Sequence, residues 1–350
     1  MKKLIVLLLI TALVLGFAGC APPEEVIPEA EKPAEDAGSG DAVADAPIRV
    51  GLVMTGPAQD GGYNQAAYDG LMDLESEMGF EVAYTDNIKQ SDDESIIREY
   101  AQQGYDLIIG HGWEYGEALA KVAADYPDIY FAQNGGDSGG SQPNLTSGMF
   151  RTSELGYLMA KTAAQMTKTN RVGFIGAMEI PTMAAEVETI QHAVPFFNPD
   201  AKVDVIYTGS WTDVAKAKET AKVMLDMGVD VIIGINNNCD TGVIQAIEES
   251  GKEAYFIGWA ADWNPVAPDI VLTSGVQSVS NLMQIVATMV KEGKFEAKAG
   301  VYGVPEDCQL LGTWSDVVPE DVRQSVIEDW EAMNSGEKTI EDFQALVGVK

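Results

Sequence analysis

The chain has 350 residues, of which 54 are acidic and 22 are basic, giving a formal net charge of −32 at pH 7. So acidic a protein repels nucleic acid and anionic lipid surfaces, and neither is an expected partner. Its 3 cysteines are too few for a disulfide scaffold.

The N-terminus has the features of a secretory signal. Two lysines precede an apolar stretch that ends in small residues, so residues 1–19 are predicted to be a signal peptide. Cys20 follows directly, and its position resembles that of the cysteine in the bacterial lipobox, which is cleaved to the N-terminus and carries diacylglycerol. An ordinary signal followed by a chance cysteine is the alternative.

Residues 20–46 are rich in proline, alanine and acid and have no apolar periodicity. Such a segment cannot bury enough surface to order itself, so we expect a flexible, self-repelling tether. A lipidated Cys20 followed by a tether predicts an extracytoplasmic protein that is lipid-anchored to the cell membrane. About 300 residues remain, which is enough for two ordinary domains.

Short apolar runs alternate with helical patterns along the remaining chain. Helices are expected at about 64–78, 91–102 and 114–124, each preceded by a short apolar strand. Continuous apolar strands with helices between them indicate an α/β fold, in which helices cover both faces of a parallel sheet.

This pattern occurs twice. The run RVGLV at Arg49 is echoed by RVGFI at Arg171, and GYDLIIG at Gly104 is echoed by GVDVIIG at Gly228. Because the two offsets are nearly equal, we interpret the chain as one supersecondary plan used twice, which gives two Rossmann-like lobes. Chance similarity between buried parallel strands is the alternative.

The two lobes are not continuous in sequence. The chain is expected to cross between them near residues 150–152, 273–275 and 304–311. These crossings define a first lobe of residues 47–151 plus 275–303 and a second lobe of residues 152–274 plus 304–350. Open α/β sheets bind ligands beyond the carboxyl ends of their strands, so we expect a ligand cleft between the lobes.

The loop GPAQDGGYNQAAYDG, residues 56–70, follows the first strand. It contains neither G-x-G-x-x-G nor G-x-x-x-x-G-K-[ST], the two standard phosphate-binding patterns. Asp60 also stands where a phosphate would need positive charge at a helix start. The loop instead offers the carboxylate of Asp60, the ring of Tyr63 and the amide of Asn64, a set that suits a flat, neutral, hydrogen-bonding ligand.

From about Ile48 to Trp314 the sequence resembles the basic membrane protein family. The resemblance rests on DGGYNQAAYDG, YPDIYFAQ, GSWTDVAKAKETA and GVIQAIEESG occurring in this order. The family consists of substrate-binding lipoproteins of bacterial ABC importers with the type I periplasmic-binding-protein fold, and its members bind purine nucleosides or related flat compounds. The resemblance therefore implies a small planar ligand and an ABC permease as partners, with no cofactor and no metal.

The resemblance also assigns roles to residues. Asp60 is expected to hydrogen-bond the ligand, while Tyr63 and Trp211 stack on the two faces of its ring, each stack being worth roughly 1–3 kcal/mol. The polar candidates for reading the ligand edge are Asp60, Asn64, Asn134, Asn238 and Asp240. The further candidates for the wall of the site are Trp113, Met178, Trp259, Asp262 and Gln277.

Two positions depart from the nucleoside binders of the family. These carry G-V-D-x-D after the strand equivalent to YFIG and a lysine in the strand equivalent to SGVQS, and both are associated with ribose hydroxyls. Here Ala260 replaces the first aspartate, leaving Asp262, and Gln277 stands in place of the lysine. Our hypothesis is a ligand that lacks the ribose, such as a free purine-like base.

Several of these residues have structural alternatives. Tyr63 is also suited to be the first inward residue of its helix, Trp211 an anchor between loop and core, and Trp113 a lobe-packing residue. Asp240 is also suited to cap the helix that follows it. His111, at a strand end, is compatible with either a ligand contact or a cap.

An enzyme is the main alternative class. The chain has no H-E-x-x-H, no G-x-S-x-G and no cysteines at metal-ligand spacing, so no catalytic or metal-binding residues are predicted. Asp60 and Asp262 opposed across a cleft, as in a glycosidase or nucleoside hydrolase, would be the enzymatic arrangement. A ligand-sensing lipoprotein that docks on a membrane receptor is the other alternative.

Overall fold

The computed structural model describes residues 46–349. The chain from Ala46 onward forms one compact unit. The expected signal peptide, Cys20 and most of the expected tether lie outside the described residues. Across residues 46–349, every helix is too short or too polar to traverse a bilayer.

The first sheet has six strands in the order β11-β5-β4-β3-β1-β2, and all of its neighbouring strands are parallel. Its strands are β1 (Arg49–Met54), β2 (Glu81–Thr85), β3 (Leu107–His111), β4 (Tyr130–Asn134), β5 (Leu145–Phe150) and β11 (Ala299–Tyr302). Its helices are α1 (Tyr63–Met78), α2 (Asp93–Gln102), α3 (Gly116–Asp125) and α8 (Val279–Lys291).

Alternation along the strands gives the first sheet two apolar faces. Leu52 of β1 packs in a cluster with side chains of α1 and α8, whereas Val53, the next residue, packs in a cluster with α2 and α3. Successive strand residues point to opposite faces, so a continuous apolar run buries both. The expected arrangement of helices on both faces is confirmed.

The second sheet has the order β12-β10-β9-β8-β6-β7, with only β12 antiparallel to its neighbour. Its strands are β6 (Arg171–Gly176), β7 (Lys202–Tyr207), β8 (Val231–Ile235), β9 (Tyr255–Ala260), β10 (Val271–Gln277) and β12 (Gln309–Leu311). Its helices are α4 (Ser153–Met166), α5 (Pro181–Phe197), α6 (Val214–Asp226), α7 (Asp240–Ser250), α9 (Glu320–Asn334) and α10 (Ile340–Val347).

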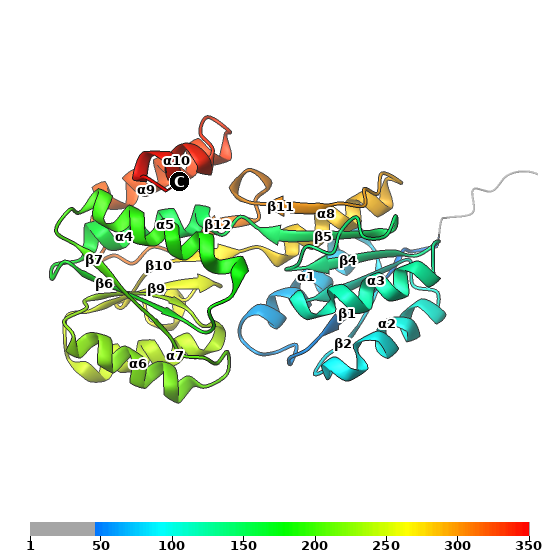
Figure 1. The fold of residues 1–350 in the computed structure, drawn as a ribbon, viewed down its shortest axis with the longest axis horizontal. Coiled ribbons are helices and arrows are strands. Elements are labelled where there is room, and N and C mark those ends of the chain that lie inside the picture. The colour runs from blue at the N-terminus through cyan, green and yellow to red at the C-terminus, as the bar shows by residue number, and fades with distance from the viewer. Residues whose placement is uncertain (1–45, 350) are drawn as a thin grey trace, which may run out of the picture. The chain divides into compact units, whose positions relative to one another are not determined.

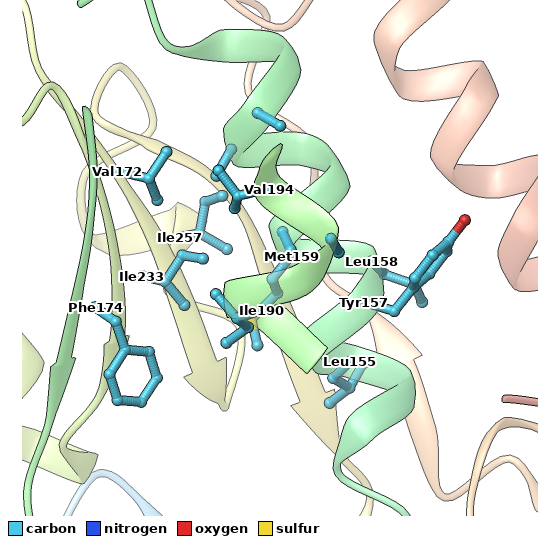
Figure 2. Close-up of a cluster of buried hydrophobic side chains, with 14 of the residues drawn as sticks. Leu155, Tyr157, Leu158, Met159, Val172, Phe174, Ile190, Val194, Ile233 and Ile257 are labelled. Atoms are coloured by element: carbon cyan, nitrogen blue, oxygen red, sulfur yellow. The ribbon is translucent and has the colours of Figure 1, made fainter. Parts of the chain in front are cut away.

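The helices again divide between the two faces of the sheet. Helices α6 and α7 cover one face, and α4 and α5 cover the other, where the C-terminal α9 and α10 form a further layer (Figure 1). Figure 2 shows Val172, Phe174, Ile233 and Ile257 of the sheet pointing at side chains of α4 and α5. Helix α4 is buried from residue 153 to residue 164, because it lies between the sheet, α5 and the C-terminal helices α9 and α10.

The predicted repeat is confirmed by the sheet order. The echoed runs RVGLV and RVGFI form β1 and β6, and the echoed runs around LIIG and VIIG form β3 and β8. These strands occupy equivalent places in the two sheets. The helices expected to begin at 91 and 114 are instead entered by short 3₁₀ turns, Gln90–Asp92 and Trp113–Tyr115, so α2 and α3 begin two residues later.

The chain passes between the sheets three times: from β5 to α4, from β10 to α8 and from β11 to β12. The sequence placed the second passage at 273–275. In the structure β10 continues to Gln277, because it pairs with β12 up to Gln277 opposite Gln309. Residues 275–277 therefore belong to the second sheet rather than to the first lobe.

Hydrogen bonds join the three passages. Arg151 donates its backbone N–H to the carbonyl of Tyr302 (2.8 Å), and the carboxylate of Glu154 accepts from the N–H of Val304 (2.7 Å). Ser278 donates its N–H to the carbonyl of Cys308 at 2.9 Å. The three connections therefore form one bonded unit between the lobes.

Candidate functional site

Asp60 organises the start of α1. Its Oδ1 accepts from the backbone N–H of Gly62 (2.8 Å) and Gln65 (3.0 Å), and its Oδ2 accepts from Nδ2 (2.9 Å) and the backbone N–H (3.3 Å) of Asn64. Although burial alone would raise it, these hydrogen bonds hold the pKa of Asp60 below its ordinary value. Both oxygens are thus engaged by the loop itself, and the predicted contact of Asp60 with a ligand stays a prediction.

Tyr63 and His111 form the next layer of the site. Tyr63 is the first residue of α1, and its ring lies 3.9 Å from that of His111, the last residue of β3, with an angle of 30° between the rings. His111 Nε2 is 3.0 Å from the carbonyl oxygen of Tyr63. A carbonyl only accepts, so Nε2 carries the proton and Nδ1 is left as an acceptor.

Burial keeps His111 neutral. Its side chain is 1% exposed, and burial lowers its pKa to about 4, although the bond to Tyr63 and the charge of Asp60 act in the opposite direction. Its Nδ1 is buried and has no hydrogen-bond partner. The first lobe therefore presents a neutral, unpaired acceptor at a strand end.

Other buried polar atoms at the strand ends of both lobes also lack partners. Buried polar groups are nearly always paired, so each such atom needs an explanation. Five of them lie at or just after the carboxyl ends of β3, β4, β8 and β9: His111 Nδ1, Asn134 Nδ2, Asn236 Oδ1, Asp240 Oδ2 and Trp259 Nε1. Atoms away from this edge are unpaired as well, among them both carboxyl oxygens of Glu186 in α5.

Asp240 and Asn236 form a buried pair in the second lobe. Asn236 Nδ2 donates to Asp240 Oδ1 (2.9 Å) and to the carbonyl of Ile175 (2.8 Å). Burial raises the pKa of Asp240 to about 7, with the hydrogen bonds from Asn236 opposing the shift. No side chain caps the start of α7, so the alternative in which Asp240 only caps this helix is wrong.

The two lobes meet at Asn237. Its Oδ1 accepts from the backbone N–H of Tyr63 at 2.9 Å, across 174 positions of sequence. Asn237 has a φ of 55°, and Ala260, at the end of β9, has a φ of 65°. Non-glycine residues in this region are strained, and such strain clusters at ligand sites.

Of the aromatic and Met candidates, Trp113, Met178 and Trp211 follow strand ends, whereas Trp259 is buried within β9. Trp113 and Met178 are exposed, at 55% and 37% of their surface. Tyr63 packs against the first-lobe core and Trp211 against the second-lobe core, so the two proposed stacking rings come from opposite lobes. A sandwich of a ligand between them stays a prediction.

The remaining candidates of the second lobe are tied into its own structure. Asp262 Oδ2 accepts from Oγ1 (2.6 Å) and N–H (3.1 Å) of Thr313, and its Oδ1 accepts from the N–H of Asn264 (3.2 Å). Gln277, the last residue of β10, is buried. Asn238 is exposed in the β8–α7 turn.

Sequence reasoning missed Asn236 and Asn237. The signal was present as the run INNNCD directly behind a buried strand, but only Asn238 and Asp240 of that run were singled out. The free thiols of Cys239 and Cys308 are both buried. Within residues 46–349 no cluster of three or more histidine, cysteine or carboxylate side chains is arranged to hold a metal ion.

Comparisons with known proteins place this site in context. The family described as ABC transporter substrate-binding protein PnrA-like (Bmp) matches residues 48–342. The transcriptional activator protein med of Bacillus subtilis is 30% identical over 279 residues, covering 79% of this chain and 86% of that protein. A purine-binding protein of Brucella abortus is 28% identical over 301 residues, covering 85% and 84%. The ABC transporter nucleoside-binding protein BmpA of Lactococcus lactis is 30% identical over 256 residues, covering 67% and 72%.

Solved structures show the same architecture. A transcriptional activator of the comK gene from Bacillus halodurans superposes with a TM-score of 0.74 and 29% identity, over 83% of this chain and 99% of that chain. A solute-binding protein of an ABC transporter system from Aeropyrum pernix has a TM-score of 0.73 and 24% identity, over 83% and 92%, which supports the fold. Proteins of the matched family are substrate-binding components of ABC transporters rather than enzymes, as the sequence analysis predicted. The chain therefore belongs to the PnrA-like (Bmp) family of ABC transporter substrate-binding proteins.

Proposed function

We propose that this protein is an extracytoplasmic lipoprotein that captures a free purine-like base between its two lobes and delivers it to an ABC permease. The observation that carries the proposal is the set of buried, unpaired polar atoms at the strand ends of both lobes. A buried polar atom without a partner costs about 1–3 kcal/mol, so a ligand that pairs several of them gains a large part of its affinity there.

The chemistry of these atoms fits the edges of a base. His111 Nδ1 is an acceptor that needs an N–H, whereas Asn134 Nδ2 and Trp259 Nε1 are donors that need a lone pair. A purine carries N–H donors and ring-nitrogen acceptors around a flat, neutral ring. It therefore offers a partner to both kinds of atom without bringing a charge into the site.

Stacking on aromatic rings supplies the second contribution to the binding free energy. Tyr63 belongs to the first lobe and Trp211 to the second, so a ligand sandwiched by both rings would hold the lobes together. A ligand that contacts both lobes stabilises the closed arrangement, since only that arrangement makes both sets of contacts. The permease would then recognise the closed pair of lobes.

Two features favour a free base over a nucleoside or a nucleotide as the ligand. The N-terminus of α1, a standard position for a phosphate, is already occupied by the Asp60 carboxylate. Asp262 is bonded to Thr313, and Ala260 and Gln277 supply no charge. The residues that hold a ribose in the nucleoside binders of the family are thus replaced or engaged elsewhere.

Calorimetric titration with adenine, adenosine and AMP tests the proposal. We expect adenine to bind, adenosine to bind more weakly and AMP to bind least. A preference of tenfold or more for adenosine would reject the free base in favour of a nucleoside. If none of the three binds, the purine assignment fails. Mass spectrometry of the mature N-terminus tests the lipid on Cys20.

A regulatory ligand sensor is the second candidate. It is favoured by the relatives from Bacillus subtilis and Bacillus halodurans, both of which are named transcriptional activators. The binding site would be the same in both roles. Deletion of the gene separates them: loss of purine uptake indicates the transporter component, and intact uptake with an altered transcriptional response to purine indicates the sensor.

A further inference from the structure

The backbone N–H groups at the start of α1 donate hydrogen bonds to side chains of both lobes. A helix begins with backbone N–H groups that have no partner within the helix. Asp60, in the loop before α1, accepts from the N–H groups of Gly62, Asn64 and Gln65. The N–H of Tyr63 is accepted by Oδ1 of Asn237, which belongs to the second lobe.

The backbone conformation of Asn237 suits this contact between the lobes. It begins the short 3₁₀ turn Asn237–Cys239 between β8 and α7, with a φ of 55°. Asparagine tolerates this left-handed conformation better than other non-glycine residues. The turn thereby directs one short amide side chain out of the second lobe.

Gly62 provides the matching surface in the first lobe. A methyl group built on Gly62 would lie 1.7 Å from Oδ1 and 2.7 Å from Cγ of Asn237. Any side chain at position 62 would therefore displace the amide. The side chain of Asn237 thus occupies the space that Gly62 leaves free.

We infer that Asn237 is a positioning residue that caps α1 from the opposite lobe and so couples the approach of the lobes to the placement of Tyr63. On its other side Tyr63 is held by His111, which donates to its carbonyl at 3.0 Å and lies under its ring. Breaking the bond to Asn237 would release one of these two restraints. The inference rests on the proposed function only for its effect on ligand affinity.

Loss of this contact changes binding in a defined direction. If the closed arrangement is the one that binds, the apparent dissociation constant equals the intrinsic one divided by the closed fraction. Removing one hydrogen bond across the lobes lowers that fraction, so we expect affinity for adenine to fall by roughly 2- to 10-fold. The backbone amide of Tyr63 should at the same time lose its protection against hydrogen exchange with solvent.

The test compares Asn237→Gly with Asn87→Gly. Both residues have a φ of 55°, so both changes remove the same amide side chain from a residue of the same positive φ. Asn87 is exposed and lies in the loop after β2. Hydrogen exchange of the Tyr63 amide, measured without ligand, should accelerate in Asn237→Gly and stay unchanged in Asn87→Gly. Asn237→Asp keeps an acceptor oxygen and should restore protection.

A second variant approaches the contact from the other lobe. Gly62→Ala should also accelerate hydrogen exchange of the Tyr63 amide. The double variant Gly62→Ala with Asn237→Gly should exchange no faster than either single variant, because each change removes the same hydrogen bond. Equal exchange in wild type and Asn237→Gly overturns the inference. Because exchange is measured without ligand, the inference about Asn237 is tested separately from purine binding. A protein that binds no purine but shows the exchange difference rejects only the proposed function.

Discussion

Lys161 of α4 and Asp329 of α9 form an ion pair of 2.5 Å with side chains only 10% and 17% exposed. Tyr157 also donates to Asp329, at 3.0 Å, and Lys161 donates to the carbonyl of Ser325 at 2.7 Å. Helix α9 is therefore fixed to α4, the buried helix that follows the first passage between the lobes. Its packing contributes to the stability of the second lobe.

We predict that Lys161→Met destabilises the protein by about 3 kcal/mol, because the largely buried Asp329 loses its cationic partner and keeps only the hydroxyl of Tyr157. The double variant Lys161→Met with Asp329→Leu should recover much of this loss. Urea unfolding measures both. The exposed pair of Lys294 and Glu292 is the control, and Lys294→Met should change stability little. Equal effects of the two lysine variants would contradict the burial argument.

Asp60→Ala should destabilise the first lobe by about 1–2 kcal/mol, since the side chain caps α1. The pKa of Asp60 is lowered in the folded state, so its contribution is present above its unfolded pKa and is lost as pH falls through the folded value. The difference between wild type and Asp60→Ala should therefore shrink in acid. Thermal unfolding at several pH values measures this. Asp128→Ala, at an exposed position, is the control.

Glu186 should make the protein less stable as pH rises. Its side chain is fully buried, both oxygens lack partners, and burial raises its pKa well above the ordinary value. The folded state therefore holds this proton more tightly than the unfolded state, and stability falls above the unfolded pKa by at most ~1.4 kcal/mol per pH unit. Glu186→Gln should flatten the profile. Glu188→Gln, at an exposed position two residues further along α5, is the matched control.

His111→Phe tests the unpaired acceptor in the proposed site. The change keeps a flat ring beside Tyr63 but removes Nδ1, so a ligand donor would be left without a partner, at a cost of about 1–3 kcal/mol. We expect the affinity for adenine, measured by calorimetry, to fall about tenfold or more. Tyr115→Phe is the matched control, since its buried, unpaired hydroxyl lies outside the proposed contacts. Equal losses in both variants would assign His111 a purely structural role.

Trp211 is predicted to stack on the ligand from the second lobe. Trp211→Ala should weaken adenine binding by roughly 1–3 kcal/mol, whereas Trp211→Phe, which keeps a ring, should lose much less. Titration of both variants, with thermal unfolding to check the fold, decides the point. Unchanged affinity in Trp211→Ala would remove this residue from the site and with it the sandwich between Tyr63 and Trp211.

The fold was predictable because its signals are local. Apolar runs such as RVGLV and RVGFI specify buried parallel strands by themselves, and their recurrence revealed the two lobes. The end of β10 was not predictable, because it is set by pairing with Gln309, far along the chain. The ends of β1, β3 and β8 could be located from sequence, and so could the residues that follow them.

The contacts made by those residues could not be predicted. Asp60 was predicted to contact a ligand, yet the engagement of both its oxygens by the loop depends on the geometry of α1. The bond between Tyr63 and Asn237 spans 174 positions and exists only where two lobes meet. His111 stayed ambiguous, because its tautomer is set by the carbonyl of Tyr63.

The three bonded connections between the lobes restrict how these can move. Arg151, Ser278 and Val304 all donate hydrogen bonds within the connecting segments, so sliding or separation of the lobes would have to break these bonds. Bending about the three connecting segments is the motion that would leave these bonds in place. The proposed closure on a ligand would then take its axis from these connecting segments rather than from the ligand.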